Sequence, residues 1–159
     1  MIEIQVNSQP VLDALNRLLA AGQNPQPILN AIGMELENRV RARFETKTDP
    51  DGKAWSAWKP STVKSYPKDG NKKLLDRYED MLRSISYQSD ANSVTVGSGA
   101  VSKPKKGEPY PYARAHEFGT KHMARRGLFT ADPAAGILGA EDEHAILAIL
   151  NDHFSKAIG

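Results

Sequence analysis

The hydrophobic positions at the start of the chain predict a short strand followed by an amphipathic helix. Residues 2–6 (IEIQV) alternate between apolar and polar side chains, as a half-buried strand does. Ser8 then offers an N-cap, and the apolar residues after it recur at helical spacing. These residues are Val11, Leu12, Leu15, Leu18 and Leu19. Because Gly22 and the sequence NPQP break the pattern, we expect residues 1–25 to form an N-terminal arm.

A second helix is predicted from about Pro27 to Glu45, because apolar residues recur there every four positions. This apolar stripe consists of Ile28, Ile32, Leu36, Val40 and Phe44. Three basic residues of the same stretch, Arg39, Arg41 and Arg43, lie largely off the stripe. We therefore expect these arginines to be solvated or to lie at an interface.

The chain between residues 74 and 98 changes from a helical to a strand-like pattern. Apolar residues follow a 3.6-residue period from Leu74 to Ile85, which predicts a third helix. After Ile85, apolar and polar side chains alternate on both sides of the turn SDANS (residues 89–93). This alternation predicts a β-hairpin with one buried face.

Two further helices are predicted in the last third of the chain. A short one is expected at residues 112–118, followed by an irregular stretch. The other begins at Ala140 and has an acidic first turn, which suits the positive end of the helix dipole. The acidic residues of this turn are Glu141, Asp142 and Glu143.

Two long loops, residues 46–73 and 99–110, separate these elements and have no helical period. The sequence TDPDG in the first loop predicts a type I turn. A calcium-binding loop that starts at Asp49 is excluded, because its twelfth position, which needs a bidentate Glu, is Pro60. Trp55 and Trp58 follow the turn. Large aromatic side chains either anchor a loop or form an interface, and we favour the anchor.

The composition is that of an ordinary folded domain. The chain has 159 residues, of which 40% are hydrophobic and 25% charged, and it contains no cysteine. Disulfides and thiolate metal sites are therefore excluded, and the absence of cysteine favours a cytoplasmic origin. No apolar run approaches the ~20 residues of a membrane span, and the N-terminus has no secretory signal pattern. We predict a single α+β domain over residues 1–159, with amphipathic helices packed on a small antiparallel β-sheet.

The net charge of +2 conceals an uneven distribution. Residues 39–126 contain 19 Lys or Arg against 10 Asp or Glu, whereas the two flanks contain 2 basic and 9 acidic residues. A basic middle favours contact with nucleic acid or an acidic protein surface, unless the lysines only keep long loops soluble. No recognition helix or nucleic-acid-binding motif accompanies this charge. The residues predicted for such contacts are Lys103, Lys105, Lys106, Arg125 and Arg126.

The sequence YARAHEFGTKHMARRG (residues 112–127) contains the residue types of a metal site without the spacing of one. Zinc peptidases place two histidines four residues apart on one helical face. His116 and His122 are six apart, which separates them by about 240° on a helix. The chain also lacks nucleophile-elbow, phosphate-loop and dinucleotide-binding motifs. We predict no catalytic residue, metal or cofactor, and the alternative is a metal-dependent hydrolase that combines His116 with a distant carboxylate.

Several short motifs occur in a recognisable order along the chain. They are Phe44, DPDGKAW (49–55), LLDRYEDMLRSISY (74–87), VTVGS (94–98), YARAHEFG (112–119) and ARRGLF (124–129), before a closing amphipathic helix. This order resembles the phage virion morphogenesis family, the tail-completion or head–tail joining proteins of Mu-like and related tailed phages and prophages. The resemblance spans about residues 10–155.

The resemblance implies a structural protein of virion assembly with no enzymatic activity. It implies a place in the virion, and in the host bacterial cytoplasm during assembly, with other tail, neck or head proteins as partners. Head–tail joints are rings, and a ring needs two different patches that meet. The basic middle of one subunit against the acidic flanks of the next would supply such a pair. The alternative is a neck or connector protein that contacts DNA.

The resemblance also suggests roles for the residues of the YARAHEFG motif. We expect a short helix that packs on the sheet and is stopped by Gly119 as a C-cap. Phe118 is expected to be the apolar anchor, and His116 to hold a backbone or carboxylate partner. The loops at 46–73 and 99–110 are expected to project toward neighbouring subunits or virion proteins. The predicted anchor or interface residues of the motif are Tyr112, His116, Glu117, Phe118 and Gly119.

Overall fold

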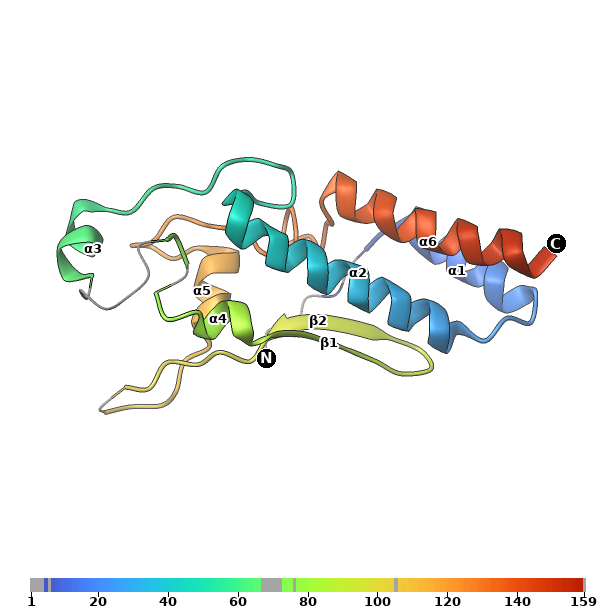
Figure 1. The fold of residues 1–159 in the computed structure, drawn as a ribbon, viewed down its shortest axis with the longest axis horizontal. Coiled ribbons are helices and arrows are strands. Elements are labelled where there is room, and N and C mark those ends of the chain that lie inside the picture. The colour runs from blue at the N-terminus through green and yellow to red at the C-terminus, as the bar shows by residue number, and fades with distance from the viewer. Residues whose placement is uncertain (1–4, 6, 67–72, 76, 105, 159) are drawn as a thin grey trace.

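The computed structural model describes residues 5, 7–66, 73–75, 77–104 and 106–158 (Figure 1). The predicted strand over residues 2–6 falls outside this part of the chain, apart from Gln5. The helices are α1 (Gln9–Ala20), α2 (Pro25–Thr46), α3 (Pro60–Ser65), α4 (Asp80–Arg83), α5 (Tyr112–Phe118) and α6 (Ala140–Ile158). The strands are β1 (Ile85–Ser89) and β2 (Val94–Ser98).

Helix α2 is the central element of the fold (Figure 1). The β1–β2 hairpin packs along one side of α2, and α1 and α6 pack along the other. The short helices α3, α4 and α5 gather with the long loops at one end of the molecule, and the C-terminal end of α6 lies at the opposite end. This arrangement of helices with a small antiparallel sheet confirms the predicted α+β class.

Local sequence signals set the starts of the first two helices. Ser8 caps α1 by accepting a hydrogen bond from the N–H of Val11 (3.4 Å), as predicted. Asn24 caps α2 in the same way through the N–H of Gln26 (3.1 Å). Helix α2 then runs for 22 residues. At 1.5 Å per residue, this length lets one helix support both halves of the core.

The hydrophobic core consists of two clusters along α2. One packs the C-terminal half of α2 against the hairpin and the loops, and it contains Val40, Phe44, Trp55, Met81, Ile85, Ala100, Ala113 and Leu128. The other packs the N-terminal half of α2 against α1 and α6, and it contains Ala14, Leu18, Ile28, Ile32, Ile146 and Leu150. The apolar stripe predicted for α2 is therefore divided between two clusters at the two ends of the helix.

The hairpin turns one face toward α2, as its alternating pattern predicted. Its register pairs Tyr87 with Val96. The side chain of Tyr87 is half-buried between two exposed neighbours, and that of Val96 is half-buried beside the exposed Thr95. Side chains of α2 cover the outer edge of β1. Glu37 accepts a hydrogen bond from the N–H of Tyr87 (3.1 Å), and Arg41 donates to the C=O of Ile85 (2.6 Å). Because unpaired strand edges invite association with other strands, these contacts protect β1.

Gly33 lets α2 approach the hairpin closely. A Cβ atom at this position would lie 2.4 Å from Cδ2 of Tyr87 and 2.8 Å from Cγ2 of Val94. We expect Gly33→Ala to lower the free energy of unfolding by about 1–3 kcal/mol, because overpacking outweighs the better helix propensity of alanine. Urea unfolding followed by circular dichroism measures this loss. Gly99→Ala is the control, since no atom lies within 4 Å of a Cβ there, and equal stabilities of the two variants would contradict the prediction.

The predicted third helix over residues 74–85 is wrong for most of its length, because α4 is the only helix among the described residues of this stretch. Leu75 and Glu79 both have a φ of 60°, which is left-handed and interrupts a right-handed helix. Met81 is nevertheless buried, and Leu74, Leu75 and Leu82 pack against the same core cluster. The spacing of these apolar residues therefore reflected their burial rather than a continuous helix.

The loop over residues 46–73 carries a turn and a short helix. Gly52 donates its N–H to the C=O of Asp49 (2.9 Å), which closes the predicted turn. Helix α3 was not predicted. It begins at Pro60, whose fixed φ suits the first helical position, and it buries none of its residues. Its position therefore depends on contacts made by the residues that flank it.

Candidate functional site

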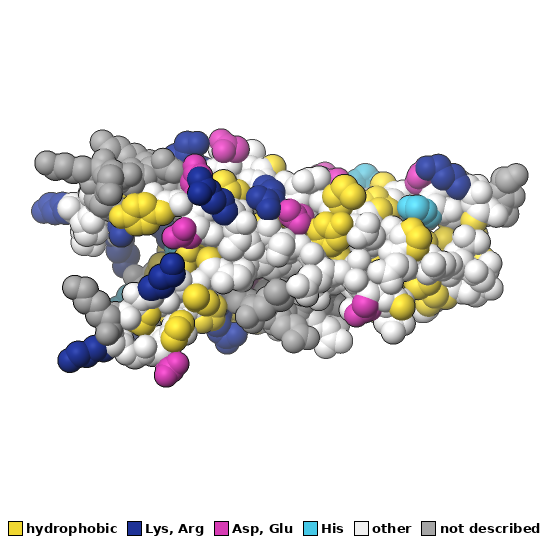
Figure 2. All heavy atoms as spheres, turned by 60° about the horizontal axis from the view of Figure 1, so that its bottom comes forward, with side chains coloured by type: hydrophobic (Ala, Val, Ile, Leu, Met, Phe, Trp, Pro, Cys, Tyr) yellow, Lys and Arg dark blue, Asp and Glu magenta, His cyan; other side chains and the backbone are white. Residues whose placement is uncertain are grey.

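A cleft of about 1050 Å³ opens at the loop end of the molecule. Figure 2 shows a hollow at this end, with Lys and Arg side chains near its rim. Residues from five separate stretches of the chain line the cleft, namely 57–66, 75 with 77–81, 101–103, 112–116 and 122–126. Both long loops contribute to these walls, so the cleft exists only when they are folded against α5.

Three side chains stack along one wall of the cleft. The rings of Trp58 and Tyr66 lie with their centroids 4.7 Å apart and an interplanar angle of 30°. The guanidinium of Arg77 lies over the Tyr66 ring, 4.5 Å from its centroid. Stacked aromatic and guanidinium groups form a flat surface that offers both apolar contact and positive charge.

Cationic side chains outnumber carboxylates among the described residues that line the cleft. The cations are Lys59, Arg77, Lys103 and Arg126, and the carboxylate is Asp80. A recess lined by one sign of charge between low-dielectric walls concentrates its field. The cleft therefore favours a partner that carries negative charge.

His116 lies in the cleft wall, and its imidazole is in the neutral form at neutral pH. Its Nδ1 is buried and has no hydrogen-bond partner among the residues that the structure describes. The pKa of His116 falls from 6.5 to about 4, because burial disfavours the charged form and the nearby Arg126 repels it. The predicted backbone or carboxylate partner is thus not present at Nδ1.

The free energy of unfolding is expected to decrease as the pH is lowered, because His116 is neutral in the folded chain. The unfolded chain binds the proton at pH values below about 6.5 and the folded chain only near 4, so acid favours unfolding between these values. We expect wild type to lose about 2 kcal/mol of unfolding free energy from about pH 7.5 to about pH 5, and His116→Gln to lose much less. Urea unfolding at both pH values measures this difference. The exposed His122 provides the control, and an equal pH effect in His116→Gln and His122→Gln would contradict the assignment.

Glu117, rather than Phe118, is the buried anchor of α5. The Glu117 carboxylate is fully buried, and its Oε2 accepts hydrogen bonds from the N–H groups of Leu128 (2.6 Å) and Phe129 (3.0 Å). Its Oε1 accepts from the N–H (3.0 Å) and the hydroxyl (2.6 Å) of Thr130. Phe118 is 38% exposed. The prediction that Phe118 anchors the helix is therefore wrong, because α5 turns the carboxylate toward the core.

Helix α5 has the predicted bounds, and Gly119 follows its last residue. Gly119 has a φ of 74°, a backbone conformation that residues other than glycine rarely adopt. A Cβ at this position would also lie 3.2 Å from the backbone N of Arg125. Tyr112, at the start of α5, is half-buried and lines the cleft. Burial raises the pKa of the Tyr112 phenol, which therefore stays neutral at physiological pH.

Arg125 and Arg126 bind the protein's own backbone. Arg126 is 8% exposed and donates hydrogen bonds to the C=O groups of Ser56 (2.8 Å) and Ala57 (3.0 Å). Arg125 donates to the C=O of Glu117 (2.8 Å). An arginine offers five N–H donors in a fixed fork, which suits such bridges. The predicted contact of these two residues with DNA or an acidic partner is corrected to an internal structural role.

The two tryptophans of the first loop have different positions. Trp55 is 6% exposed, and its Nε1 donates to the C=O of Gly127 (3.1 Å). Its ring meets Phe44 edge-on, with the centroids 5.8 Å apart. Trp55 therefore anchors the loop in the core, whereas Trp58 is half-buried and lines the cleft.

The three lysines predicted for partner contact differ in where they lie relative to the cleft. Lys103 is exposed and lines the cleft, and Lys106 is exposed further along the same loop. Lys105 lies outside the described residues. Tyr66 and Arg77 line the cleft but were not among the predicted site residues. A single aromatic or basic residue in a loop has no spacing pattern, so the sequence alone did not indicate them.

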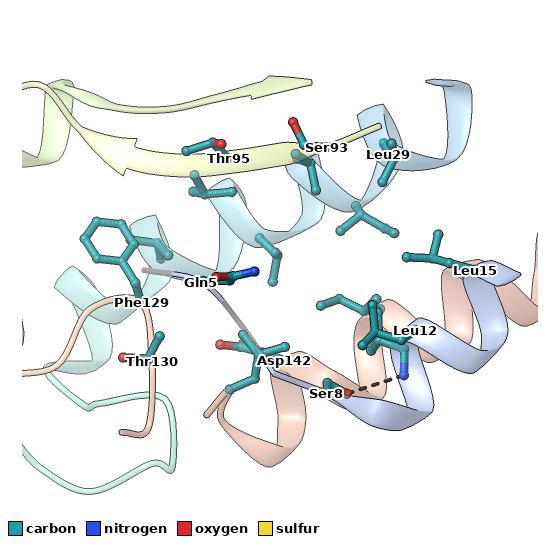
Figure 3. A pocket seen from close by; sticks show the side chains of 18 of the residues that line it. Gln5, Ser8, Leu12, Leu15, Leu29, Ser93, Thr95, Phe129, Thr130 and Asp142 are labelled. Carbon is teal, nitrogen blue, oxygen red and sulfur yellow. Dashed lines mark hydrogen bonds between the residues drawn. The ribbon is translucent and has the colours of Figure 1, made fainter. Parts of the chain in front are cut away.

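A second cavity, of about 550 Å³, lies in the middle of the molecule between α1, α2, α6 and β2 (Figure 3). Its lining is mainly apolar, and Figure 3 shows Leu12, Leu15 and Phe129 around it, with Asp142 at one side. Ser8, at its edge, makes the capping hydrogen bond drawn as a dashed line. None of the predicted site residues lines this cavity, so we assign it to the packing between the core clusters.

The metal-site alternative requires a distant carboxylate near the two histidines. His116 and His122 both line the cleft. Among the described residues, no group of three or more His, Asp or Glu side chains is placed to hold a metal ion. In the same part of the chain, no helix has the length and apolar character of a membrane span.

These features define a small α+β protein with a cleft walled by its loops. The chain belongs to the phage virion morphogenesis family, whose family model matches residues 6–155. No curated protein and no solved structure matches it. The family predicted from the order of motifs is thereby confirmed, and the protein takes part in the assembly of phage virions.

Proposed function

We propose that this protein completes the tail, or joins the tail to the head, during the assembly of a tailed phage. It acts as a structural component of the virion and catalyses no reaction. The observation that supports this role most directly is the loop-walled cleft at one end of the molecule, away from the helical cluster of α1 and α6. A site of this shape, with aromatic and cationic walls, suits the binding of another protein.

Removal of the gene from a phage that encodes it tests this function. We expect complete heads and tails to accumulate without joining, or tails to remain unfinished, and we expect plasmid expression of the protein to restore infectious particles. Electron microscopy of the lysates and plaque counts provide the measurements. The protein itself is expected in purified particles by mass spectrometry. Normal particles from the deletion strain would overturn the proposal.

We also propose that the protein works as a homo-oligomeric ring. The expected contact between the basic middle and the acidic flanks has to be revised, because part of this charge pairs within one chain. Asp142 on the acidic flank binds Arg39 and Arg43 of the basic middle, and Glu143 accepts a hydrogen bond from Ser8 (2.8 Å). These groups are therefore not available for a ring contact, which depends on the rest of the surface. Native mass measurement at low and high salt tests it, and a monomer at all concentrations, also in the presence of tail particles, would contradict it.

The alternative function is contact with DNA in the neck of the particle. The exposed Lys103 and Lys106, together with Tyr110, which is 46% exposed, favour it. Phosphate contacts by lysine and stacking by tyrosine are typical of non-specific nucleic-acid binding. Salt-dependent retention of duplex DNA that is lost in Lys103→Glu and Lys106→Glu would support this alternative over protein joining.

A further inference from the structure

We propose that the cleft at the loop end is a docking site for an extended acidic segment of another virion protein. This inference rests on the proposed function and specifies the partner's chemistry. The segment is expected to carry Asp or Glu side chains for the cationic rim and apolar or aromatic side chains for the interior. The partner is a different polypeptide rather than DNA or a second copy of this chain.

The charge of the cleft favours an acidic occupant. Among the described lining residues, four side chains are cationic and one is a carboxylate. Lys103 is exposed and lines the cleft from a different stretch of the chain than the stacked Trp58 and Tyr66. Arg126 is held by backbone carbonyls, so its charge adds to the field of the cleft without a direct contact. A carboxylate that enters the cleft is attracted by these positive charges.

The interior of the cleft favours a polypeptide over a nucleic acid. Apolar and aromatic side chains line it alongside the cations, and they include Leu75, Met81, Val101, Tyr112 and Met123. Tyr78 and Val101, at 51% and 44% exposure, present apolar surface that an occupant would cover. Single-stranded nucleic acids bind grooves that combine cations with stacking aromatic side chains, whereas the aliphatic and methionine side chains of this cleft are typical of interfaces between proteins. A volume of about 1050 Å³ accommodates a few residues of an extended chain and excludes a duplex.

A second copy of the chain is a poor source of the acidic segment. Its acidic flanks contain 9 Asp or Glu against 2 Lys or Arg, but several of these carboxylates already have partners in their own chain. Asp142 is 1% exposed in its salt bridges, and Asp152 binds Lys156 (2.6 Å). Both of these carboxylates also belong to a regular helix rather than to an extended segment. Another virion protein is therefore the better donor.

Fluorescence anisotropy with defined peptides tests the proposal on the full chain. The probe is a labelled peptide of about nine residues in which Asp and Glu alternate with Phe and Leu. Its counterpart has Lys in place of every acidic residue. We expect the acidic peptide to bind, and Lys103→Glu to weaken binding about tenfold. Arg17→Glu is the matched control, because it makes the same charge change on the exposed surface of α1, outside the cleft.

Several outcomes would overturn the proposal. They are no binding of the acidic peptide, equal binding of its Lys counterpart, and equal weakening by Lys103→Glu and Arg17→Glu. Displacement of the peptide by a lower concentration of a single-stranded oligonucleotide of about 12 nucleotides would assign the cleft to nucleic acid. Amide chemical shifts that change on α1 and α6 instead of around the cleft would move the site elsewhere.

The test separates this inference from the proposed function. Lys103→Glu and Arg17→Glu are also introduced into the plasmid that restores particle formation in the deletion strain. We expect Lys103→Glu to reduce particle yield and Arg17→Glu to leave it unchanged. If Lys103→Glu restores particles fully and the empty plasmid does not, the assembly function stands and the docking site is wrong. If the deletion strain makes normal particles, the function itself fails.

Discussion

Replacing Glu117 with alanine is expected to lower the free energy of unfolding by about 4 kcal/mol or more. The buried carboxylate accepts hydrogen bonds from the N–H groups of Leu128, Phe129 and Thr130. Alanine leaves all three donors without this acceptor. A hydrogen bond to a charged group contributes about 1.5–3 kcal/mol, and a buried donor left unpaired costs about 1–3 kcal/mol. The free energy of unfolding of natural domains is only about 5–15 kcal/mol, so this variant is expected to be mostly unfolded at 37 °C. Urea unfolding and the yield of soluble protein measure the loss.

Milder substitutions provide the controls for Glu117→Ala. Glu117→Gln keeps one acceptor but turns an NH2 group toward backbone donors, so we expect a loss of about 2 kcal/mol. Phe118→Ala is expected to cost less than about 1 kcal/mol, because the ring is 38% exposed and its contact with Arg114 is at the surface. Glu108→Ala, in an exposed loop, is expected to change stability by less than about 0.5 kcal/mol. A larger effect for Phe118→Ala than for Glu117→Ala would show that the sequence-based assignment was right.

The contrast between Glu117 and Phe118 shows where sequence reasoning failed at the site. Hydrophobicity favours Phe118 as the buried residue, since aromatic side chains gain most from leaving water. The outcome depends instead on the backbone N–H groups of residues 128–130, which converge at one point in the folded chain. A segment 11 residues further along the chain therefore decides which side of α5 is buried. No spacing within the YARAHEFG motif contains that information.

Sequence reasoning succeeded where neighbouring residues determine the conformation. The N-cap at Ser8, the helical spacing of α1 and α2, and the alternation in the hairpin are all local patterns, and the structure has these elements. Gly119 after α5 follows the same logic, because a positive φ favours glycine regardless of tertiary contacts. The α+β class followed from the succession of these elements.

Sequence reasoning failed where the tertiary fold overrides a local pattern. The apolar residues from Leu74 to Ile85 have helical spacing, yet Leu75 and Glu79 adopt left-handed conformations. These residues reach the core cluster around Met81 as separate contacts. The cleft illustrates the same limit, because its walls come from stretches up to 69 residues apart, such as those joined by the bond from Arg126 to Ala57.

One arginine of the basic middle was also misassigned from the sequence. Arg43 was expected to be solvated or at an interface, whereas Asp142 lies in the acidic first turn of α6, as predicted. The structure buries both, with side-chain exposures of 8% and 1%, and joins them in a salt bridge across 99 residues of sequence. Net charge along a chain does not reveal such pairs, because it contains no distances. The polarised charge distribution thus stabilises the fold of one subunit, in addition to any role between subunits.

The second large effect is expected for Asp142→Ala, which should lower the free energy of unfolding by about 3–5 kcal/mol. Asp142 receives two hydrogen bonds from Arg43, at 2.6 Å and 2.5 Å, and one from Arg39 (2.8 Å). Without the carboxylate, the buried guanidinium of Arg43 keeps its charge and loses its counter-ion. The neighbouring Glu141 is exposed, so Glu141→Ala is expected to cost less than about 1 kcal/mol. Urea unfolding compares the two, and equal losses would show that Asp142 acts only through the helix dipole.

The effects of Glu117 and Asp142 are expected to be coupled, because both sites hold the same residue. Glu117 accepts the N–H of Leu128, and Arg43, which Asp142 positions, donates to the C=O of Leu128 (2.5 Å). Leu128 is fully buried, so release of one side of this residue loosens the other.

We expect the combined loss in Glu117→Gln with Asp142→Asn to differ from the sum of the single losses by about 1 kcal/mol or more. Glu117→Gln with Gly33→Ala is the matched pair, since Gly33 contacts the hairpin, and additivity within about 0.5 kcal/mol is expected there. Additive losses in both pairs would mean that α5 and α6 are held to Leu128 independently.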